Sequence, residues 1–162
     1  MAKKGKKNEF SEDGVKILSV NRKARFNYIV EETLECGIEL KGTEVKSLRN
    51  GKFSFSDSYA IVNKLELWLI QFHISPYDFG NIHNHDADRN RKLLAHKQEI
   101  KRLSRRIDEK GITLVPLRLY LKNSKIKVEI GLCKGKNVQD KRNTIKERDE
   151  KRSVEREFRQ RF

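Results

Sequence analysis

The chain has 162 residues, enough for one domain with extra length at its ends, and a formal net charge of +14. Hydrophobic residues make up 36% and charged residues 37% of it, so we expect a compact core in only part of the chain. No stretch approaches the roughly 20 apolar residues of a membrane-spanning helix, and no apolar signal region follows the basic start. The charge therefore favours nucleic acid over a membrane as the polyanionic partner.

The first 14 residues, with four lysines and little to bury, predict a flexible basic arm that either contacts RNA or only aids solubility. From Val15 the chain becomes apolar, and a basic cluster then follows at Arg22, Lys23 and Arg25. The alternating residues Phe26, Tyr28 and Val30 predict a strand. Cations interleaved with aromatic rings suit a surface for phosphates and stacked bases, although a place in the core is the preferred interpretation of Phe26 and Tyr28.

The stretch from Glu35 to Arg49 organises the rest of the chain. Period-two alternation predicts a half-buried strand that Gly42 ends, and Thr43 suits the N-cap of a short helix. We expect Lys46 and Arg49 to point outward beside Glu35. A carboxylate next to fixed cations could position a polar ligand, and a plain corner with solvated charges is the alternative interpretation.

The two cysteines, Cys36 and Cys133, lie in apolar alternation that suits strands. Such cysteines are typical of buried residues in a reducing compartment, and no second cysteine lies close enough to either for a zinc ribbon. We therefore expect a soluble, cytoplasmic protein.

The polar loop from Ser75 to Asn90 contains His83, His85 and Asp86, which could ligate a metal or serve a nuclease. Two histidines in such a loop lack the supporting ligands of a metal site, and no nucleophile–base pair accompanies them. The sequence therefore predicts no metal, no other cofactor and no catalysis. A loop of this length in a small domain is often functional.

Beyond this loop, Arg91 and Lys92 lead through Leu94 to His96. Apolar residues recur at helical spacing from Leu93 to residue 107, which predicts a helix ending before the glycine at 111. The basic residues flanking Leu94 suit phosphate contacts, and a solvated helix face is the alternative interpretation.

The remaining apolar segments predict strands. Residues 59–62 and 65–70 flank a polar link at 63–64 and predict a hairpin. Residues 113–121 contain Pro116, which indicates an edge or a bulge, and residues 126–133 alternate most regularly. About six strands with two or three short helices predict a mainly β fold, a small, partly open β-barrel of the oligonucleotide-binding type, over residues 15–135.

At Gly135 the hydrophobic pattern stops, and residues 136–162 are dominated by charge. Acid-first pairs four residues apart, such as Glu147 with Lys151, favour a helix. Three apolar residues on one face cannot stabilise a packed helix alone. We expect this basic tail to be disordered in isolation and helical on a partner.

Five motifs in this order resemble the SsrA-binding protein (SmpB) family over roughly residues 17–152. The motifs are Asn21-Arg22-Lys23-Ala24-Arg25, Glu35-Cys36-Gly37-Ile38, Gly42-Thr43-Glu44-Val45-Lys46-Ser47-Leu48-Arg49, Arg91-Lys92-Leu93-Leu94, and Gly135-Lys136 with Asp140-Lys141-Arg142. The resemblance implies a non-catalytic RNA-binding factor of trans-translation, with a barrel of the oligonucleotide-binding type. Its implied partners are the tRNA-like domain of transfer-messenger RNA and stalled ribosomes, and elongation factor Tu is a further candidate in the delivery complex.

The resemblance also implies roles for individual residues. Glu35, Leu94 and His96 match the RNA-binding surface of the family, and His96 stands where the family places asparagine. Gly135 would be a pivot, with Lys136, Gln139, Asp140, Lys141 and Arg142 entering the decoding centre and the empty messenger channel of the small subunit. Gln139 stands where the family often has histidine or tyrosine, and glutamine stacks poorly. The main rival is a general single-strand RNA-binding barrel that stacks bases on Phe26, Tyr28, Phe53, Phe55 and Tyr59.

Overall fold

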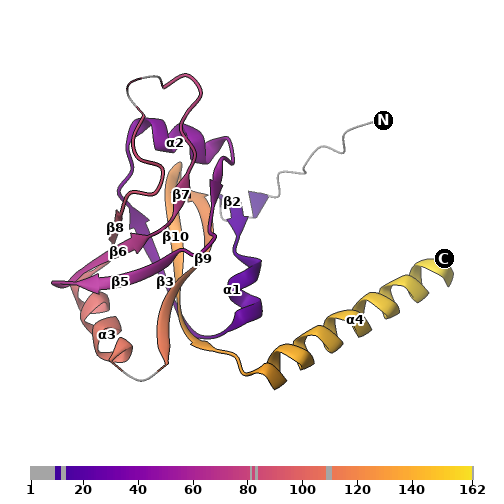
Figure 1. Cartoon of the computed structure of the whole chain (residues 1–162). Helices are drawn as coiled ribbons and strands as arrows, with labels where there is room; N and C mark the ends of the chain where they lie inside the picture. The colour runs from indigo at the N-terminus through magenta and orange to yellow at the C-terminus, as the bar shows by residue number, and fades with distance from the viewer. Residues whose placement is uncertain (1–9, 12–13, 81, 83, 109–110, 162) are drawn as a thin grey trace.

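The computed structural model describes residues 10–11, 14–80, 82, 84–108 and 111–161 (Figure 1). Within them the elements follow one another as β1 (Phe10–Ser11), β2 (Val15–Val20), α1 (Arg22–Asn27), β3 (Tyr28–Ile38), α2 (Gly42–Arg49), β4 (Phe53–Ser54), β5 (Tyr59–Asn63), β6 (Glu66–Ile70), β7 (His73–Ile74), β8 (Arg91–Leu94), α3 (Lys97–Ile107), β9 (Ile112–Lys122), β10 (Lys125–Gly135) and α4 (Val138–Arg161). The lysines of the predicted N-terminal arm lie outside the described residues, and β1 falls within the range assigned to that arm.

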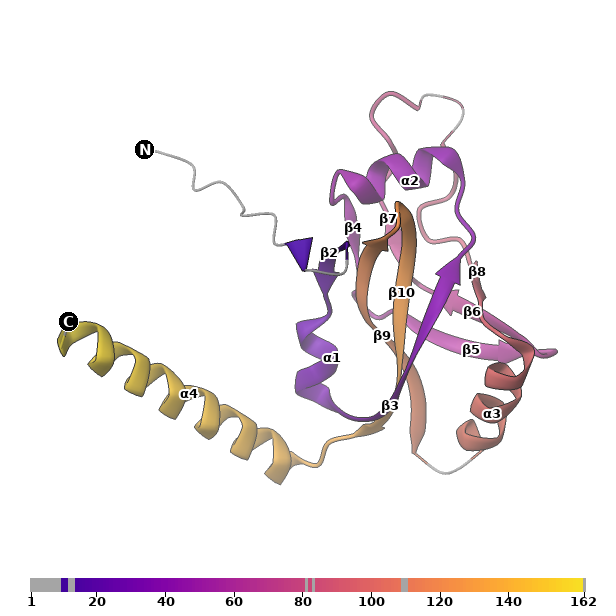
Figure 2. The same cartoon turned by 180° about the vertical axis from the view of Figure 1, so that it is seen from behind.

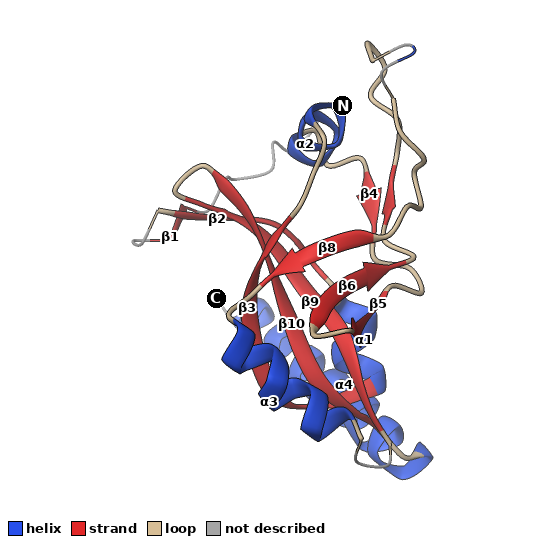
Figure 3. Cartoon of the chain, turned by 90° about the vertical axis from the view of Figure 1, so that its left-hand side faces the viewer, coloured by secondary structure: helices blue, strands red, loops and turns tan. Residues whose placement is uncertain are grey.

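Eight of these strands form one sheet in the order β1-β2-β9-β10-β3-β8-β6-β5. All of its neighbouring strands pair antiparallel, and Ala60 of β5 pairs with Leu114 of β9, so the sheet curls back on itself (Figure 3). Because a single residue pair makes this closure, the barrel is only partly closed. The predicted mainly β, partly open barrel is confirmed, with short strands such as β1 adding to the number expected.

The apolar side chains that alternate along the strands fill the barrel. Leu67, Leu69, Leu119 and Val128 are fully buried there, and burying each such side chain contributes about 1.5–3 kcal/mol. The helices α2 and α3 lie at opposite ends of the barrel (Figures 1 and 2). Leu48 of α2 and Ile100 and Leu103 of α3 belong to the same core.

Both cysteines are buried and free, as predicted. Burial raises the pKa of the Cys36 thiol to about 12 and that of the Cys133 thiol to about 11. Both thiols therefore stay protonated at neutral pH, and they act as small apolar residues.

The predicted start of the strand at Phe26 is wrong by two residues. Residues 22–27 form the helix α1, and the strand β3 begins at Tyr28. Asn21 is the reason. Its side-chain oxygen accepts the Ala24 N–H at 3.0 Å, and its Nδ2 donates to the Pro116 carbonyl at 2.9 Å. Ala24 then packs against Leu117 on the outer face of β9. A cap and a tertiary contact thus override the local alternation.

Two smaller predictions are also wrong in detail. The N-cap of α2 is Lys41, not Thr43, and the Lys41 N–H donates to the Glu44 carboxylate at 2.7 Å. The predicted hairpin is confirmed as β5 and β6, but its turn is Lys64-Leu65, with φ angles of 48° and 60°. The turn moves by one residue because residues 63 and 66 form the last cross-strand pair.

The helix predicted to begin at Leu93 starts only at Lys97, because residues 91–94 form the strand β8 between β3 and β6. Leu93 is buried and Leu94 is 53% exposed, which is the alternation of a strand. Pro116 lies at a bulge, as predicted, since Glu129 pairs with residue 118 and Ile130 with residue 116. On its other side β9 pairs with β2 over residues 118–122 and with β5 at Leu114, so Pro116 lies in the gap between these two pairings.

The tail forms the 24-residue helix α4, which projects away from the barrel (Figures 1 and 2). Its apolar residues Val138, Ile145 and Val154 are exposed. A helix is the state expected of the tail on a partner, and its state in isolation stays a prediction. Among the described residues, no helix combines the length and apolar character needed to cross a bilayer.

Candidate nucleic-acid interface

Glu35 lies on β3 and projects from the outer surface of the barrel into a polar network. The hydroxyl of Tyr120 donates to its Oε2 at 2.6 Å, and the Nζ atoms of Lys122 and Lys127 lie 3.2 and 3.8 Å from its carboxylate oxygens. The hydrogen bond from Tyr120, and then the two lysines, hold the pKa of Glu35 below its ordinary value. The side chain is 38% exposed, so an ionised acceptor faces solvent among cations.

The strand register explains why this carboxylate can sit there. Glu129 of β10 lies directly opposite Glu35, and like charges in that position repel. Arg118 of β9 relieves the repulsion, because its Nε donates to Glu129 at 2.7 Å while its guanidinium lies over the ring of Tyr120. Glu129 thus pairs with Arg118, and Glu35 pairs with Lys122. Tyr120 contacts both pairs, through its hydroxyl to Glu35 and its ring to Arg118.

An exposed apolar residue adjoins this network. Gly37 follows Glu35 on the same face of β3 and pairs with Leu94 of β8. A Cβ atom at Gly37 would come within 3.1 Å of the Cβ of Leu94, so the absence of a side chain lets Leu94 rest on the strand. A groove lined by Gly37, Leu94 and Lys127 runs along this edge. The surface therefore offers an acceptor, cations and an apolar contact together.

His96 continues this surface beyond Leu94. It is exposed at the N-cap of α3, and its N–H donates to the Glu99 carboxylate at 2.8 Å. The strand pairing places Leu94 opposite Gly37, two residues from Glu35, and His96 follows Leu94 by two residues; these are the three residues that the family resemblance assigned to RNA.

The prediction that Lys46 and Arg49 lie beside Glu35 is wrong. Both are exposed on α2, where the Nζ of Lys46 lies 5.2 Å from the centre of the Tyr77 ring. Neighbours across the sheet supply the cations instead, because Lys122 of β9 and Lys127 of β10 reach Glu35. Lys122 and Tyr120 alternate with buried Leu119 in the sequence. That pattern indicates an outward face, but only the pairing of the strands brings it to Glu35.

Arg91, predicted to contact RNA, is fully buried, which contradicts that prediction. Its guanidinium binds Glu44 of α2 at 2.9 and 3.0 Å and donates to the carbonyls of Phe72, Ala87 and Arg89. Every polar direction of the side chain is thus used inside the protein. The neighbouring Lys92 is half-buried and pairs with Glu66.

A second arginine completes this buried ion pair. Arg89 donates two hydrogen bonds to the Glu44 carboxylate, from Nε at 2.8 Å and from a terminal nitrogen at 2.6 Å. Burial alone would raise the pKa of Glu44, but the hydrogen bonds from Arg89 and the Lys41 N–H, with the charge of Arg91, outweigh burial and lower it. The cluster of Glu44, Arg89 and Arg91 ties α2 to β8 and to the end of the 75–90 loop.

The basic cluster of α1 lies beside the start of the tail (Figure 2). Arg22, Lys23 and Arg25 are all exposed. Lys136, the first residue after β10, donates through its N–H to the Asn27 carbonyl at 2.9 Å and through Nζ to the Arg25 carbonyl at 3.3 Å. The same Nζ lies 3.3 Å from the Thr144 hydroxyl on α4.

The predicted tail residues lie at the first turns of α4. Gly135 ends β10, and the Asp140 carboxylate accepts the Asn137 N–H at 3.3 Å. Gln139 and Arg142 are exposed, and Lys141 is half-buried. None of these side chains reaches the Glu35 network in the described part of the chain, so the predicted residues divide between two surfaces.

Of the two loop histidines that could ligate a metal, only His85 lies within the described residues. Within the described residues, no group of three or more His, Cys, Asp or Glu side chains could hold a metal ion. His85 and Asp86 are exposed, whereas His83 lies outside the described residues. His73 instead pairs with Asp88, at 2.9 Å between Nδ1 and Oδ1.

Comparison with known proteins gives the family. The model of the SmpB protein family matches residues 18–160. The SsrA-binding protein of Treponema denticola is 56% identical over 144 residues, which cover 89% of this chain and 94% of that protein. The SsrA-binding protein of Thermosynechococcus vestitus is 52% identical over 150 residues, which cover 92% and 99%. A chain of the solved structure described as "tmRNA-SmpB: a journey to the center of the bacterial ribosome" is 48% identical with a TM-score of 0.64, covering 74% of this chain and 85% of its own. The resemblance in the sequence is confirmed, and the chain belongs to the SmpB family.

Proposed function

We propose that this protein is an RNA-binding factor that binds the tRNA-like domain of transfer-messenger RNA and delivers it to stalled ribosomes in the cytoplasm. Its membership of the SmpB family supports this proposal, as do relatives named SsrA-binding protein and a structural neighbour studied with tmRNA and the bacterial ribosome. The Glu35 network carries the proposal on the structural side. The role is binding, without catalysis by the protein itself.

The Glu35 network suits folded RNA better than a uniform strand of phosphates. Folded RNA is recognised by its shape, its backbone and its unpaired bases. The Glu35 carboxylate can accept a hydrogen bond from a base N–H or a 2′-hydroxyl, while Lys122 and Lys127 neutralise adjacent phosphates. Leu94 offers an apolar contact for a base or a ribose. A surface that only neutralised phosphates would gain nothing from a carboxylate at its centre.

We assign the tail a second task on the ribosome. α4 follows β10 and projects away from the barrel (Figure 1), and its first turns carry Lys141 and Arg142. A projecting cationic helix can enter an RNA-lined channel, where phosphate contacts offset the cost of ordering it. In this proposal Gly135 and Lys136 set its exit, and the tail occupies the decoding site and the empty messenger channel.

The test compares affinities for the tRNA-like domain and for an unstructured RNA of equal length, across a range of salt concentrations. We expect a strong preference for the structured RNA that Glu35→Ala weakens about tenfold or more, because a hydrogen bond to a charged group contributes about 1.5–3 kcal/mol. Glu31→Ala is the matched control, since it removes the same charge from β3 but at a residue paired with Arg106 of α3.

The truncation after Gly135 separates the two tasks. We expect the truncated protein to keep its affinity for the tRNA-like domain. We also expect it to lose the ability to support trans-translation on stalled ribosomes. Equal affinity of the whole chain for both RNAs, lost in parallel as salt rises, would refute the proposal. That result would favour the general single-strand binder, whose stacking surface the structure does not favour because Phe53 and Phe55 pack against buried Phe72.

A further inference from the structure

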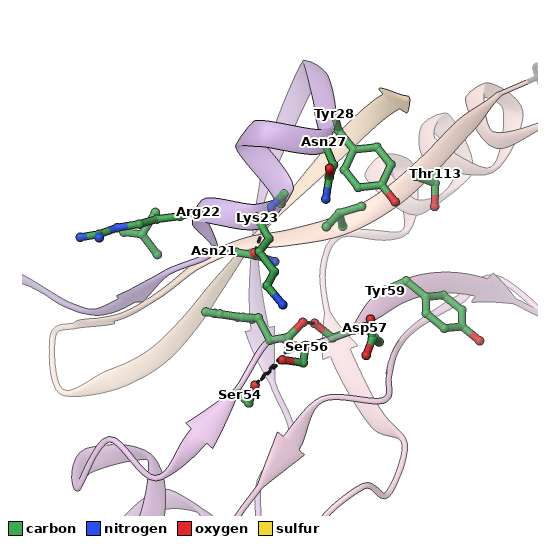
Figure 4. A pocket seen from close by; sticks show the side chains of 15 residues that line it. Asn21, Arg22, Lys23, Asn27, Tyr28, Ser54, Ser56, Asp57, Tyr59 and Thr113 are labelled. Carbon is green, nitrogen blue, oxygen red and sulfur yellow. Dashed lines mark hydrogen bonds between the residues drawn. The ribbon is translucent and has the colours of Figure 1, made fainter. Parts of the chain in front are cut away.

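A pocket apart from the Glu35 network lies between α1 and the segment 54–59 (Figure 4). The side chains of Lys23 and Asn27 extend from α1 toward Ser56 and Asp57 on the opposite wall. Tyr28 and Tyr59 flank one end of the pocket, and Thr113 of β9 lies beside them. Cationic, amide, carboxylate, hydroxyl and aromatic groups therefore converge on one hollow.

The polar groups of the pocket differ in how far the fold already uses them. Asn21 is fully engaged, as the cap of α1 and as a donor to β9. Ser54 and Ser56 hydrogen-bond to each other at 3.0 Å. By contrast, the side chains of Lys23, Asn27 and Asp57 make no hydrogen bond or ion pair with any described part of the chain. Three groups of different chemistry thus remain available to a ligand.

The backbone at Asp57 adds an independent observation. Its φ angle of 60° lies in the left-handed region, which is unfavourable for most residues and tolerated by Asp and Asn. Ser58, the next residue, fixes the turn through a hydrogen bond from its hydroxyl to the Phe55 carbonyl at 2.6 Å. The fold therefore holds the Asp57 carboxylate at the pocket wall by a turn that Asp tolerates and most other residues do not.

We propose that this pocket binds one unpaired ribonucleotide of an RNA partner. Its phosphate lies on Lys23, with Arg22 at the rim, its base packs at the Tyr28 and Tyr59 end, and the Asp57 carboxylate accepts from the ribose hydroxyls. Asn27 hydrogen-bonds the base, because an amide both donates and accepts. The inference rests on the proposed function only in that the partner is RNA.

The mixture of groups favours a nucleotide over a phosphate alone. A site for phosphate alone gathers cations and backbone N–H groups, and a carboxylate facing Lys23 works against it. A carboxylate is instead a good acceptor for ribose hydroxyls, which distinguish RNA from DNA. Aromatic rings give base contacts that do not depend strongly on sequence.

The pocket is also too far from Glu35 to be part of the same contact. Tyr28 and Glu35 are seven residues apart on β3, so about 23 Å of strand separates them. A different segment of RNA must therefore reach the pocket.

The first test is an NMR titration of the full chain with AMP, GMP, CMP and UMP, and with inorganic phosphate for comparison. We expect saturable shifts at the amides of Asn27, Asp57 and Thr113 with at least one nucleotide, and no comparable shifts around Glu35. Shifts of equal size with inorganic phosphate would overturn the proposal, as would the absence of saturable shifts with every nucleotide.

Two variants test the assigned roles. Tyr59→Ala should weaken nucleotide binding at least fivefold because a stacked base is lost, while Tyr59→Phe keeps the ring and should bind as the unmodified protein does. Asp57→Gly keeps the same backbone conformation and removes the acceptor, so it should abolish the preference for AMP over deoxy-AMP. An unchanged preference in Asp57→Gly would overturn the assignment even if Tyr59→Ala failed to fold.

The outcomes separate this inference from the proposed function. If Glu35→Ala weakens binding of the tRNA-like domain while no nucleotide enters the pocket, the function stands and the inference fails. If nucleotides bind the pocket but structured and unstructured RNA bind equally, the inference stands and the proposed function fails.

Discussion

Replacing Arg91 by methionine removes a buried cation while keeping a long unbranched side chain, so the change tests the polar contacts of this side chain. In the structure Arg91 is fully buried and binds the Glu44 carboxylate and three backbone carbonyls. Methionine leaves those carbonyls without this donor and leaves Glu44, which is 5% exposed, with fewer partners. Arg91→Met should therefore destabilise the fold strongly.

The expected loss is about 3 kcal/mol. Removing one partner of a buried ion pair typically costs about 3–5 kcal/mol, because the remaining charge is left without compensation. The lower end applies here, since Arg89 still holds Glu44 with two hydrogen bonds. A loss of that size is a large share of the roughly 5–15 kcal/mol by which domains are stable.

Urea unfolding of Arg91→Met, followed by circular dichroism, measures this loss. Lys92→Met is the matched control, because it makes the same substitution at the next residue, whose ion pair with Glu66 is partly exposed and should contribute little. RNA affinity is measured on both variants under conditions where both are folded. A variant Arg91→Met as stable as the unmodified protein but weaker in RNA binding would refute the structural role and make Arg91 an RNA contact.

Three further predictions follow from the same structure. Glu44→Gln should lower the urea midpoint much more at pH 7 than at low pH, because the folded pKa of Glu44 lies below its ordinary 4.5, so its contribution is present above about pH 4.5 and is lost as pH falls through the folded pKa. Gly37→Ala should displace Leu94, 3.1 Å from the new Cβ, and so weaken binding of the tRNA-like domain, measured by titration; unchanged affinity would mean that Leu94 does not contact RNA. Amides of α4 should exchange with deuterium far faster than those of β10 in mass spectrometry, since Ile145 and Val154 of α4 are exposed; equal protection would contradict a helix without packing.

The barrel was predictable from sequence because its signals are local. Alternation between buried residues such as Leu119 and exposed residues such as Lys122 is visible in the chain and fixes the faces of a strand. The turn at Asn123-Ser124 marks the end of β9 in the same way, whereas the strand expected to end at Gly42 already ends at Ile38, and Gly42 begins α2. At Phe26 alternation was the only signal for a strand, and the predicted strand was wrong there. The chain forms α1 instead because Asn21 caps the helix, and the position of Asn21 depends partly on its hydrogen bond to β9.

The partners within the site were less predictable, because strand register brings together residues that are distant in the chain. Glu35 was found, but its neighbours Tyr120, Lys122 and Lys127 lie 85 to 92 positions further along. Arg91 shows the opposite error. An arginine in a basic run suggests a phosphate contact. The neighbouring sequence does not show that Arg91 is buried and paired with the Glu44 carboxylate of α2.

One strand connects the two surfaces that the proposed function uses. β10 contributes Lys127 to the Glu35 network and ends at Gly135, where Lys136 hydrogen-bonds to α1 and to Thr144 of α4. Gly135 lies eight positions after Lys127, so about 26 Å of strand separates them. Since β10 is paired on both sides along this length, it behaves as a rigid spacer between the surface proposed for transfer-messenger RNA and the exit of the tail. In the proposed function, that separation would let one small barrel hold its RNA on one side while α4 enters the ribosome on another.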